Sequence, residues 1–424
     1  MGATITTLTS LLKEFYIGPV NEELNNEIMV VQLMTKARVS WNGRLAYFPF
    51  HAARNSGVGF RAENATLPTA GNQTYRNFTL NAAFVYGRFE VSGPAIASAK
   101  SSGAGAFIGW MEAEMTRLKD DVRDSVNRAM VSGGRLVGFV TGHETGGTTL
   151  AFRGDINKLQ AAIDAKGSAV TVQVIRLDRL SAATAYNTVS TQTVSATDAA
   201  LGQITISATT TSGGDLGWAH AINISDGHAS LNYLDTEPIG IYGNLASQTL
   251  FGVARNAAGA TPAPILQSTV LTQAVATGAN ITGVALSIPR IQVMFDQLLQ
   301  YSGMEPDCLL TSPLQRNRYT NLLTATLQTW TNKAEKGDGG FSSLSYGNIP
   351  FKTSRHFDNG QIIFMTLKSW KYAELEPGGF ADLDGEVLSR VSNADAWEGF
   401  YKWYYNVICT RPNCNGILTG LTLQ

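Results

Sequence analysis

The stretch that decides the fold is Ser287–Pro313, SIPRIQVMFDQLLQYSGMEPDCLLTSP. It places apolar residues on one helix face, at positions i, i+3, i+4, i+7 and i+8: Ile291, Met294, Phe295, Leu298 and Leu299. Ser287 is typical of a helix N-terminus and Gly303 of a helix end. Asp307–Thr311 then reads as a buried strand that leads into a second helix, with Ser312 as N-cap and Pro313 at the first helical position. The stretch predicts helix, strand and helix in an α+β unit.

Two further strand patterns follow this unit. Gly347–Phe351 and Gln361–Met365 flank a turn around Asp358–Gly360, and we predict that they form a hairpin. Near the end of the chain, alternate residues are large and apolar along one face of a strand: Tyr401, Trp403, Tyr405, Val407 and Cys409. Because this aromatic strand comes so late, it must return to a sheet begun earlier.

A long amphipathic helix is predicted over residues 106–130. Its apolar stripe repeats at three and four: Met111, Met115, Leu118, Val122 and Val126, with Met130 closing it. Gly133 and Gly134 are typical of a helix end. A helix of about 25 residues is roughly 37 Å long at 1.5 Å per residue. We call it the spine helix, because it is long enough to run the width of a flat subunit.

A protruding hairpin is predicted ahead of the spine helix. Leu45–Phe50 and Phe78–Val91 have strand patterns, and the polar stretch between them is dominated by Asn, Gly, Ala, Thr and Arg. An isolated two-stranded hairpin is at best marginally stable in water. We therefore expect this hairpin to rest on a neighbouring chain.

The region from about 150 to 236 reads as a small β-rich insertion. A short helix is predicted over 156–165, with strands at 170–174, 201–206 and 219–224. Residues 1–44 show no length of clean periodicity and read as an arm that lies on something else.

Composition narrows the classes of function. Hydrophobic residues make up 44% of the 424 residues and charged residues 15%, against roughly 25% charged in an average protein. The net charge of −1 gives no basic excess that would indicate a dedicated nucleic-acid binder. Three cysteines fit neither a disulfide framework nor a zinc spacing, so a reducing cytoplasm is expected. We find no signal peptide and no membrane-spanning window, and we expect no membrane partner.

The sequence contains fragments of catalytic and metal-binding motifs, and each fragment lacks residues that the motif requires. His143-Glu144 lacks the second histidine of a zinc-binding helix, and Lys166-Gly167-Ser168 lacks a preceding phosphate-binding loop. Asp382–Glu386 has its glycine at the fourth position, where a calcium loop needs it at the sixth. The five histidines lie in separate segments. We therefore expect no enzyme, and predict no catalytic, cofactor-binding or metal-binding residues.

The order of these elements resembles the major capsid protein of tailed bacteriophages, the Hong Kong 97-type fold. Three stretches carry most of the likeness: the spine helix directly after its long hairpin, residues 291–323, and the strands 347–351 and 360–364. Residues 397–416 are similar to the returning strand of that family's peripheral domain. The resemblance implies a structural subunit that self-assembles as hexamers and pentamers into an icosahedral shell around double-stranded DNA.

The resemblance also implies a domain plan and partners. Residues 1–44 would be the N-terminal arm, 45–93 the extended loop, 94–149 with 396–424 the peripheral domain, 150–236 the insertion and 237–395 the axial domain. The expected place is the virion capsid, after assembly in the host cytoplasm. Expected partners are other copies of the chain, a portal and packaged DNA in weak non-specific contact, and a decoration protein is left open. No long acidic coiled-coil segment occurs at the N-terminus, so we also expect a separate scaffolding protein.

Candidate contacts between subunits lie mainly in the extended loop: Arg54, Phe60, Arg61, Arg76 and Arg88. The arginines could pair with carboxylates of adjacent subunits, each exposed pair contributing about 0–1 kcal/mol. The alternative for each arginine is a solvated loop residue.

Three other classes of protein remain open at this point. A cellular nanocompartment shell would share the fold and differ mainly in its cargo. A β-rich surface binding protein would explain 150–236 but leave the hairpin without support. An enzyme would need a concave site with convergent polar groups.

Some members of the resembled family join extended-loop lysines to asparagines by isopeptide bonds. No lysine occurs between Arg44 and Ser98, so the amine that such a bond requires is missing. We predict that mature shells boiled in detergent run as a single subunit band on a denaturing gel. A ladder of covalent multimers would contradict this prediction.

Overall fold

The computed structural model describes residues 30, 33–36, 41–94, 104–143, 148–176, 188–207, 220–245, 251, 253, 266–272, 275–277, 280–326, 344–381, 388–392 and 394–422. Most of the predicted arm, the 382–386 loop and residues 144–147 of the histidine motif lie outside these described residues.

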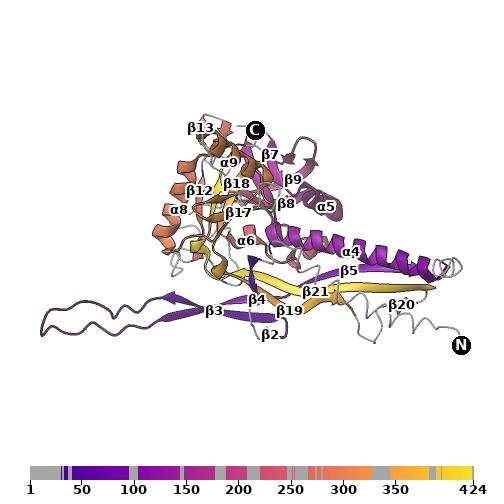
Figure 1. The fold of residues 1–424 in the computed structure, drawn as a ribbon, viewed down its shortest axis with the longest axis horizontal. Coiled ribbons are helices and arrows are strands. Elements are labelled where there is room, and N and C mark those ends of the chain that lie inside the picture. The colour runs from indigo at the N-terminus through magenta and orange to yellow at the C-terminus, as the bar shows by residue number, and fades with distance from the viewer. Residues whose placement is uncertain are drawn as a thin grey trace, which may run out of the picture.

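The lower layer of the molecule is long and flat, and a taller part stands above one portion of it (Figure 1). The spine helix and the long strands form the lower layer. Helices α8 and α9 and the barrel described below lie in the taller part, while a two-stranded ribbon projects far to one side. The chain therefore has an extended outline in which much of the surface is open to contact.

The spine helix, α4 (Ala104–Ser132), confirms the predicted helix. It packs on a five-stranded sheet in which β1, β19, β21 and β20 are neighbours in that order and β5 also pairs with β21. The bounds are β1 Thr35–Lys36, β5 Ala83–Ser92, β19 Trp370–Phe380, β20 Ser389–Arg390 and β21 Ala396–Cys409. The alternate residues of β21 that the aromatic pattern singled out are all 0% exposed. The late strand thus returns to an earlier sheet, as predicted.

Glycine brings the spine helix close to this sheet. A Cβ at Gly87 of β5 would lie 2.7 Å from Val122 Cγ2 and 2.9 Å from Leu118 Cδ1 of the helix. Real Cβ atoms essentially never come so near a neighbour. The helix can therefore sit at this height over β5 only because residue 87 has no side chain.

The ribbon consists of β3 (Leu45–Ala53) and β4 (Thr74–Asn81), with the short β2 (Trp41–Asn42) beside β3. Its two strands are antiparallel, from Leu45 opposite Asn81 to Ala53 opposite Thr74. The predicted strand over 78–91 is broken at Ala82, and β5 leaves the ribbon to pair with β21. The phase of burial explains the break, because Phe78 and Leu80 are buried on even positions whereas Ala83 and Val91 are buried on odd ones.

The α+β unit contains the predicted helix–strand–helix: α8 Ile288–Ser302, β15 Cys308–Thr311 and α9 Pro313–Thr326. Its sheet has the order β12-β22-β18-β15-β17-β16. The remaining bounds are β12 Thr269–Thr272, β16 Ser345–Tyr346, β17 Ile349–Thr353, β18 Gln361–Met365 and β22 Gly416–Thr419. Gly303 ends α8 in the left-handed conformation (φ 68°) as expected, but Ser287 makes no side-chain cap hydrogen bond.

The predicted hairpin of β17 with β18 is wrong. Strand β15 lies between them, parallel to β17 and antiparallel to β18. All of β15 is buried, so both of its edges need a hydrogen-bonding strand. The hairpin in this region joins β16 to β17, where Gly347 and Asn348 both have positive φ. The predicted N-cap hydrogen bond of Ser312 is also not seen, because its buried Oγ has no hydrogen-bond partner within the described residues.

The β-rich region is a closed barrel of six strands in the order β10-β7-β6-β11-β8-β9. The bounds are β6 Leu136–His143, β7 Thr149–Gly154, β8 Val170–Arg176, β9 Thr188–Asp198, β10 Gln203–Ile206 and β11 His220–Ile224. The predicted short helix is α5 (Ile156–Lys166), and three of the strands were also predicted. Strands β6, β7 and β9 were missed. Strand β6, which follows the spine helix, already belongs to the barrel. The barrel therefore starts at Leu136, earlier than the predicted insertion.

Shorter elements connect these parts. They are η1 Ala229–Asp235, α6 Ile241–Leu245, β13 Val275–Thr277, β14 Asn280–Thr282, η2 Leu367–Ser369 and η3 Pro412–Cys414.

Gly87→Val should lower the free energy of unfolding by roughly 1–3 kcal/mol, because the added methyl groups overpack the contact between β5 and the spine helix. Gly59→Val is the matched control, since a Cβ at Gly59 meets nothing within 4 Å. Urea denaturation of the unassembled chain measures both. Equal stability of the two variants would contradict the close packing.

Candidate assembly surfaces

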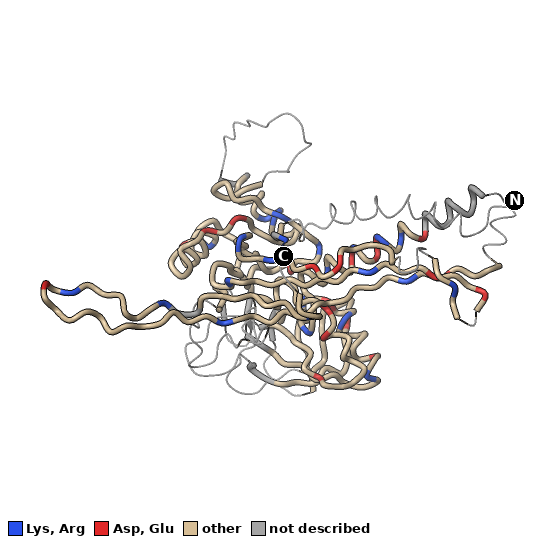
Figure 2. The backbone as a smooth tube through the Cα atoms, turned by 90° about the horizontal axis from the view of Figure 1, so that it is seen from below, with Lys and Arg blue, Asp and Glu red and all other residues tan. Residues whose placement is uncertain are grey.

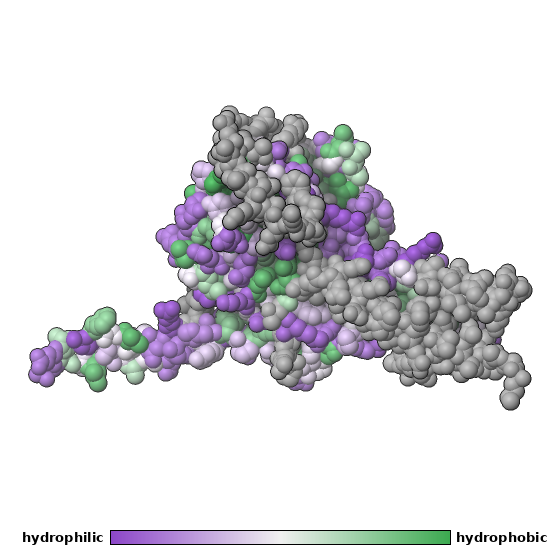
Figure 3. All heavy atoms as spheres, viewed as in Figure 1, coloured by the Kyte–Doolittle hydropathy of each residue, from purple (hydrophilic) through white to green (hydrophobic). Residues whose placement is uncertain are grey.

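The ribbon exposes apolar side chains that a solitary chain would bury. Val58 is 84% exposed, Leu67 82%, and Phe60 fully exposed, and Tyr47 and Tyr75 are also open to solvent. Figure 3 shows green apolar side chains on the projecting ribbon, far from the body of the molecule. Clustered exposed apolar residues mark surfaces that bind other molecules.

In the outer part of the ribbon, the backbones of its two sides approach each other closely. A Cβ at Gly57 would lie 2.7 Å from the Thr69 carbonyl oxygen and 2.9 Å from the Gly71 nitrogen. The Gly57 N–H donates to Asn55 Oδ1 at 2.7 Å. Glycines at this close approach let the backbones meet, so the apolar side chains beyond it are carried by a narrow, paired ribbon.

The root of the ribbon packs on the lower sheet. Ala46, Phe78 and Leu80 are buried in one cluster with Ala373 of β19 and Ile408 of β21. Rings of the two ribbon strands stack here, Phe50 on Phe78, with centroids 4.4 Å apart. The ribbon therefore has a rigid base within its own chain, and only its outer part lacks a partner surface.

The predicted contact residues fall into two groups. Arg54, Phe60, Arg61 and Arg76 all lie on the ribbon and are exposed. Figure 2 shows mostly blue charged segments along it. Within the described residues the three ribbon arginines have no carboxylate partner. Their role between subunits remains a prediction.

Arg88 lies elsewhere. It is on β5 of the lower sheet, with Nε 2.7 Å from Glu398 Oε2 and Nη2 3.1 Å from Glu90 Oε2. Its carboxylate partners thus come from its own chain, through the pairing of β5 with β21. Arg88 was predicted to lie in the extended loop, because the sequence does not show that the ribbon ends before β5.

Sequence reasoning missed a second exposed surface, the aromatic patch formed by Phe84, Tyr86 and Tyr404. The rings of Phe84 and Tyr404 meet edge to face at 4.9 Å, and Tyr86 OH donates to Tyr404 OH at 3.1 Å. This hydrogen bond, together with burial, raises the pKa of Tyr404 to about 12. Phe84 and Tyr86 occupy the even positions of β5, which face away from the spine helix. The alternation of β5 residues between the two faces of the sheet was the sequence signal from which this patch could have been predicted.

A charged cluster fastens the end of the spine helix to the barrel. Glu237 accepts from Lys158 Nζ at 2.8 Å, from Arg128 Nη2 at 2.9 Å and from the Gly134 N–H at 3.1 Å. Lys158 Nζ also donates to the Gly134 carbonyl and lies 3.5 Å from the Ser132 carbonyl oxygen. A cation at the carboxyl end of a helix is favourable, because the helix dipole is negative there.

The charge of Glu237 is favoured by this cluster. Burial acts to raise its pKa, but Lys158 and Arg128 outweigh that effect, and the pKa lies below its ordinary value. Glu237 is therefore ionised at neutral pH.

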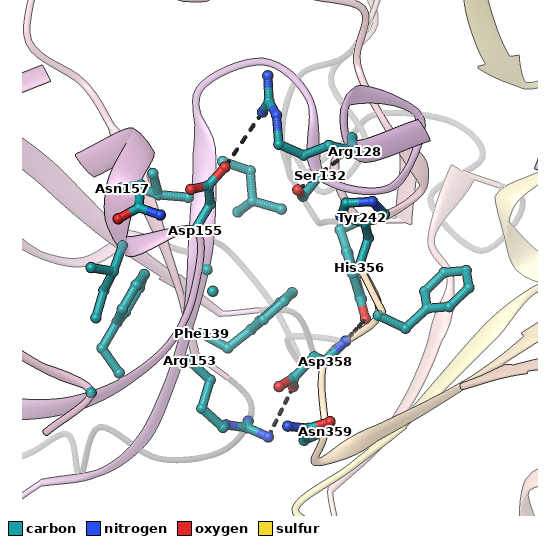
Figure 4. A pocket seen from close by; sticks show the side chains of 18 of the residues that line it. Arg128, Ser132, Phe139, Arg153, Asp155, Asn157, Tyr242, His356, Asp358 and Asn359 are labelled. Atoms are coloured by element: carbon teal, nitrogen blue, oxygen red, sulfur yellow. Dashed lines mark hydrogen bonds and ion pairs between the residues drawn. The ribbon is translucent and has the colours of Figure 1, made fainter. Parts of the chain in front are cut away.

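A cavity of about 610 Å³ lies where the barrel, the spine helix and the loop of residues 354–360 meet. Figure 4 shows Arg153 of the barrel pointing toward Asp358 of that loop, and Arg128 toward Asp155. Phe139 and Tyr242 pack edge to face beside it at 4.7 Å. Burial outweighs the attraction of Arg153 and raises the pKa of Asp358.

The described residues contain no group of three or more His, Cys, Asp or Glu side chains that could hold a metal ion. In the same part of the chain, no helix combines the length and apolar character needed to span a bilayer.

Comparison with known proteins shows the fold. No protein-family model matches the sequence, and no curated protein is significantly similar to it. A chain of the cyanophage A-1(L) capsid asymmetric unit is 11% identical, with a TM-score of 0.52 over 94% of this chain and 93% of that one. This likeness shows that the chain shares the fold of a phage capsid chain, and it confirms the predicted α+β class and the predicted resemblance.

Two weaker likenesses were also found. A chain from the capsid of a native GTA particle is 8% identical over 92% of this chain and 89% of that one, with a TM-score of 0.47. A chain of Mycobacterium phage Adephagia is 11% identical over 99% and 98%, with a TM-score of 0.41.

Glu237→Gln should reduce the free energy of unfolding at pH 7 by about 1.5–3 kcal/mol, the usual worth of hydrogen bonds to a charged group. A lowered pKa means that the stabilisation is present above the unfolded value, 4.5, and is lost as pH falls through the folded pKa. The stability of the wild type should therefore fall more steeply than that of the variant below about pH 5.

Glu114→Gln is the control for this measurement. Glu114 lies on the spine helix and faces Arg117 only at 3.8 Å, with a side chain that is 37% exposed. Chemical denaturation at a series of pH values measures all three proteins. If Glu237→Gln kept the pH slope of the wild type, the charged cluster would have no such role.

Proposed function

We propose that this chain is the major capsid protein of a tailed bacteriophage, a structural subunit that self-assembles as hexamers and pentamers into an icosahedral shell around double-stranded DNA. The observation that carries the proposal is the likeness to a cyanophage capsid chain over nearly the whole length of both chains. A match confined to one domain would support only a shared module. Here the ribbon, spine helix, barrel and α+β unit are all included in the matched length.

The exposed ribbon supports assembly on independent grounds. Its exposed apolar side chains, and its arginines that have no carboxylate partner among the described residues, could both be covered by a neighbouring subunit. The low share of charged residues agrees, because permanent interfaces are large and apolar. We infer that the ribbon overlaps an adjacent subunit and that Arg54, Phe60, Arg61 and Arg76 contact it.

The domain plan is proposed with bounds adjusted to the described strands. The extended loop would be 45–81, since β5 pairs in the lower sheet, and the insertion would begin at Leu136. The spine helix with the lower sheet would form the peripheral domain, and the α+β unit the axial domain around the hexamer or pentamer axis. Strands β19 and β20, within 237–395, would thereby move from the axial to the peripheral domain, and β22, within 396–424, to the axial domain.

We further infer the location and the partners. The chain would be made in the host cytoplasm and end in the virion capsid. A portal and a separate scaffolding protein would act during assembly, and the finished shell would leave room for a decoration protein. A net charge of −1 fits weak, non-specific contact with packaged DNA. A structural role implies no catalytic step and no cofactor.

The purified chain, with and without its neighbouring phage gene products, should form closed shells or six-fold and five-fold rings. Light scattering after size exclusion and negative-stain microscopy measure this. A chain that stays monomeric at high concentration with scaffold present would overturn the proposal. Shells that enclose protein cargo in place of DNA would favour a cellular nanocompartment.

Phe60→Asp should raise the subunit concentration needed for assembly at least about tenfold, because burying one unpaired charge in an interface costs more than 1.4 kcal/mol. Its melting temperature should match that of the wild type, since Phe60 contacts solvent in the free chain. Leu201→Asp is the matched control, an exposed leucine (68%) beside the barrel strand β10. Normal assembly of Phe60→Asp would remove Phe60 from the interface.

A further inference from the structure

Six charged residues form a ring at the cavity between the barrel, the spine helix and the 354–360 loop, and all of them except Asp124 line it. Each of these three segments supplies one anion and one cation to the ring. The spine helix supplies Asp124 and Arg128, the barrel Arg153 and Asp155, and the loop Arg355 and Asp358.

The ion pairs run in one direction around the ring. Asp124 of the helix pairs with Arg355 of the loop, Asp358 of the loop with Arg153 of the barrel, and Asp155 of the barrel with Arg128 of the helix. The last two contacts are 2.9 Å and 3.6 Å. Every segment is thereby tied to each of the other two. Two further contacts add to these ties: His356 Nε2 of the loop lies 3.3 Å from Asp124 Oδ1, and Arg128 also pairs with Glu237 at 2.9 Å.

The three pairs differ in how far water reaches them. Arg153 and Asp358 are 9% and 5% exposed, Arg128 and Asp155 are 28% and 20%, and Arg355 and Asp124 are 71% and 50%. A buried ion pair adds little stability over apolar side chains of equal size, but removing one partner strands the other charge. The ring therefore adds little to the overall stability of the chain, but it favours one arrangement of the three segments.

We propose that this ring is a conformational latch, which holds the barrel in one orientation against the spine helix and the α+β unit and which, once opened, lets the barrel shift as a folded body. The cavity at its centre leaves space into which side chains and water can move. The barrel is suited to moving whole, because its strands close on themselves and surround a hydrophobic core of their own.

The apolar contact beside the ring limits the movement. Leu136, Phe139 and Ala221 of the barrel belong to the main core of the subunit, together with Tyr242 and Phe357. Asp358 is tied to the same place, since its backbone N–H donates to Tyr242 OH at 3.0 Å. Opening the latch would therefore loosen this contact along with the ion pairs, in one cooperative step.

Hydrogen exchange of the full chain, followed by mass spectrometry, tests the latch. In Asp358→Asn the amides of 354–360, of 153–157 and of the last turns of the spine helix should exchange at least tenfold faster. Amides of β8 and β11 should stay as protected as in the wild type. Faster exchange throughout the barrel, or no change at the three segments, would overturn the proposal.

A second variant separates a ring from three independent pairs. Arg355→Ser removes the most exposed of the six charges, and within the described residues no hydrogen bond or ion pair joins Arg355 to the barrel. A latch predicts faster exchange at 153–157 in this variant as well, whereas faster exchange confined to the 354–360 loop would refute the ring. Arg88→Ser, which breaks an exposed pair on β5, is the control and should leave all three segments unchanged. The measurement uses free subunits, so its outcome does not depend on shell formation.

Discussion

The packing of the spine helix on the β5–β21 pair is the contact on which the rest of the structure depends. Gly87 lets the helix come close, and Tyr401, Trp403 and Tyr405 fill the space beneath it without exposure. The ribbon is rooted on the neighbouring strands of this sheet, and the barrel begins just beyond the end of the helix. The chain passes from the α+β sheet to the lower sheet between β18 and β19, and it returns between β21 and β22.

Apolar and charged side chains have separate tasks in this subunit. Apolar residues fill four buried clusters within the described residues, and they are also exposed on the ribbon and in the aromatic patch. Many of the charged residues gather where the barrel meets the spine helix and the 354–360 loop. Apolar surface therefore faces outward where we propose contact between copies, and charge sets the angles between parts of one copy.

The barrel joins the subunit by two kinds of contact. Phe139 against Tyr242 provides apolar area, which attracts without fixing a direction. The ion pairs and the Glu237 cluster add direction, because each needs particular atoms at short distance. In a shell built from many copies, small changes of angle within the subunit would be repeated at every position, so a junction of this kind bears on shell geometry.

Local patterns in the sequence determined the spine helix, α8, β15 and the aromatic strand β21, because helical and strand periodicity depend on which residues a few positions apart share a face. Only the tertiary structure decided which strands pair: β15 between β17 and β18, and β5 with β21 in place of the ribbon. It also decided that Arg88 meets Glu398 and that Arg153 meets Asp358. Such partners lie far apart in the sequence, and no periodicity along the chain records a contact made through space.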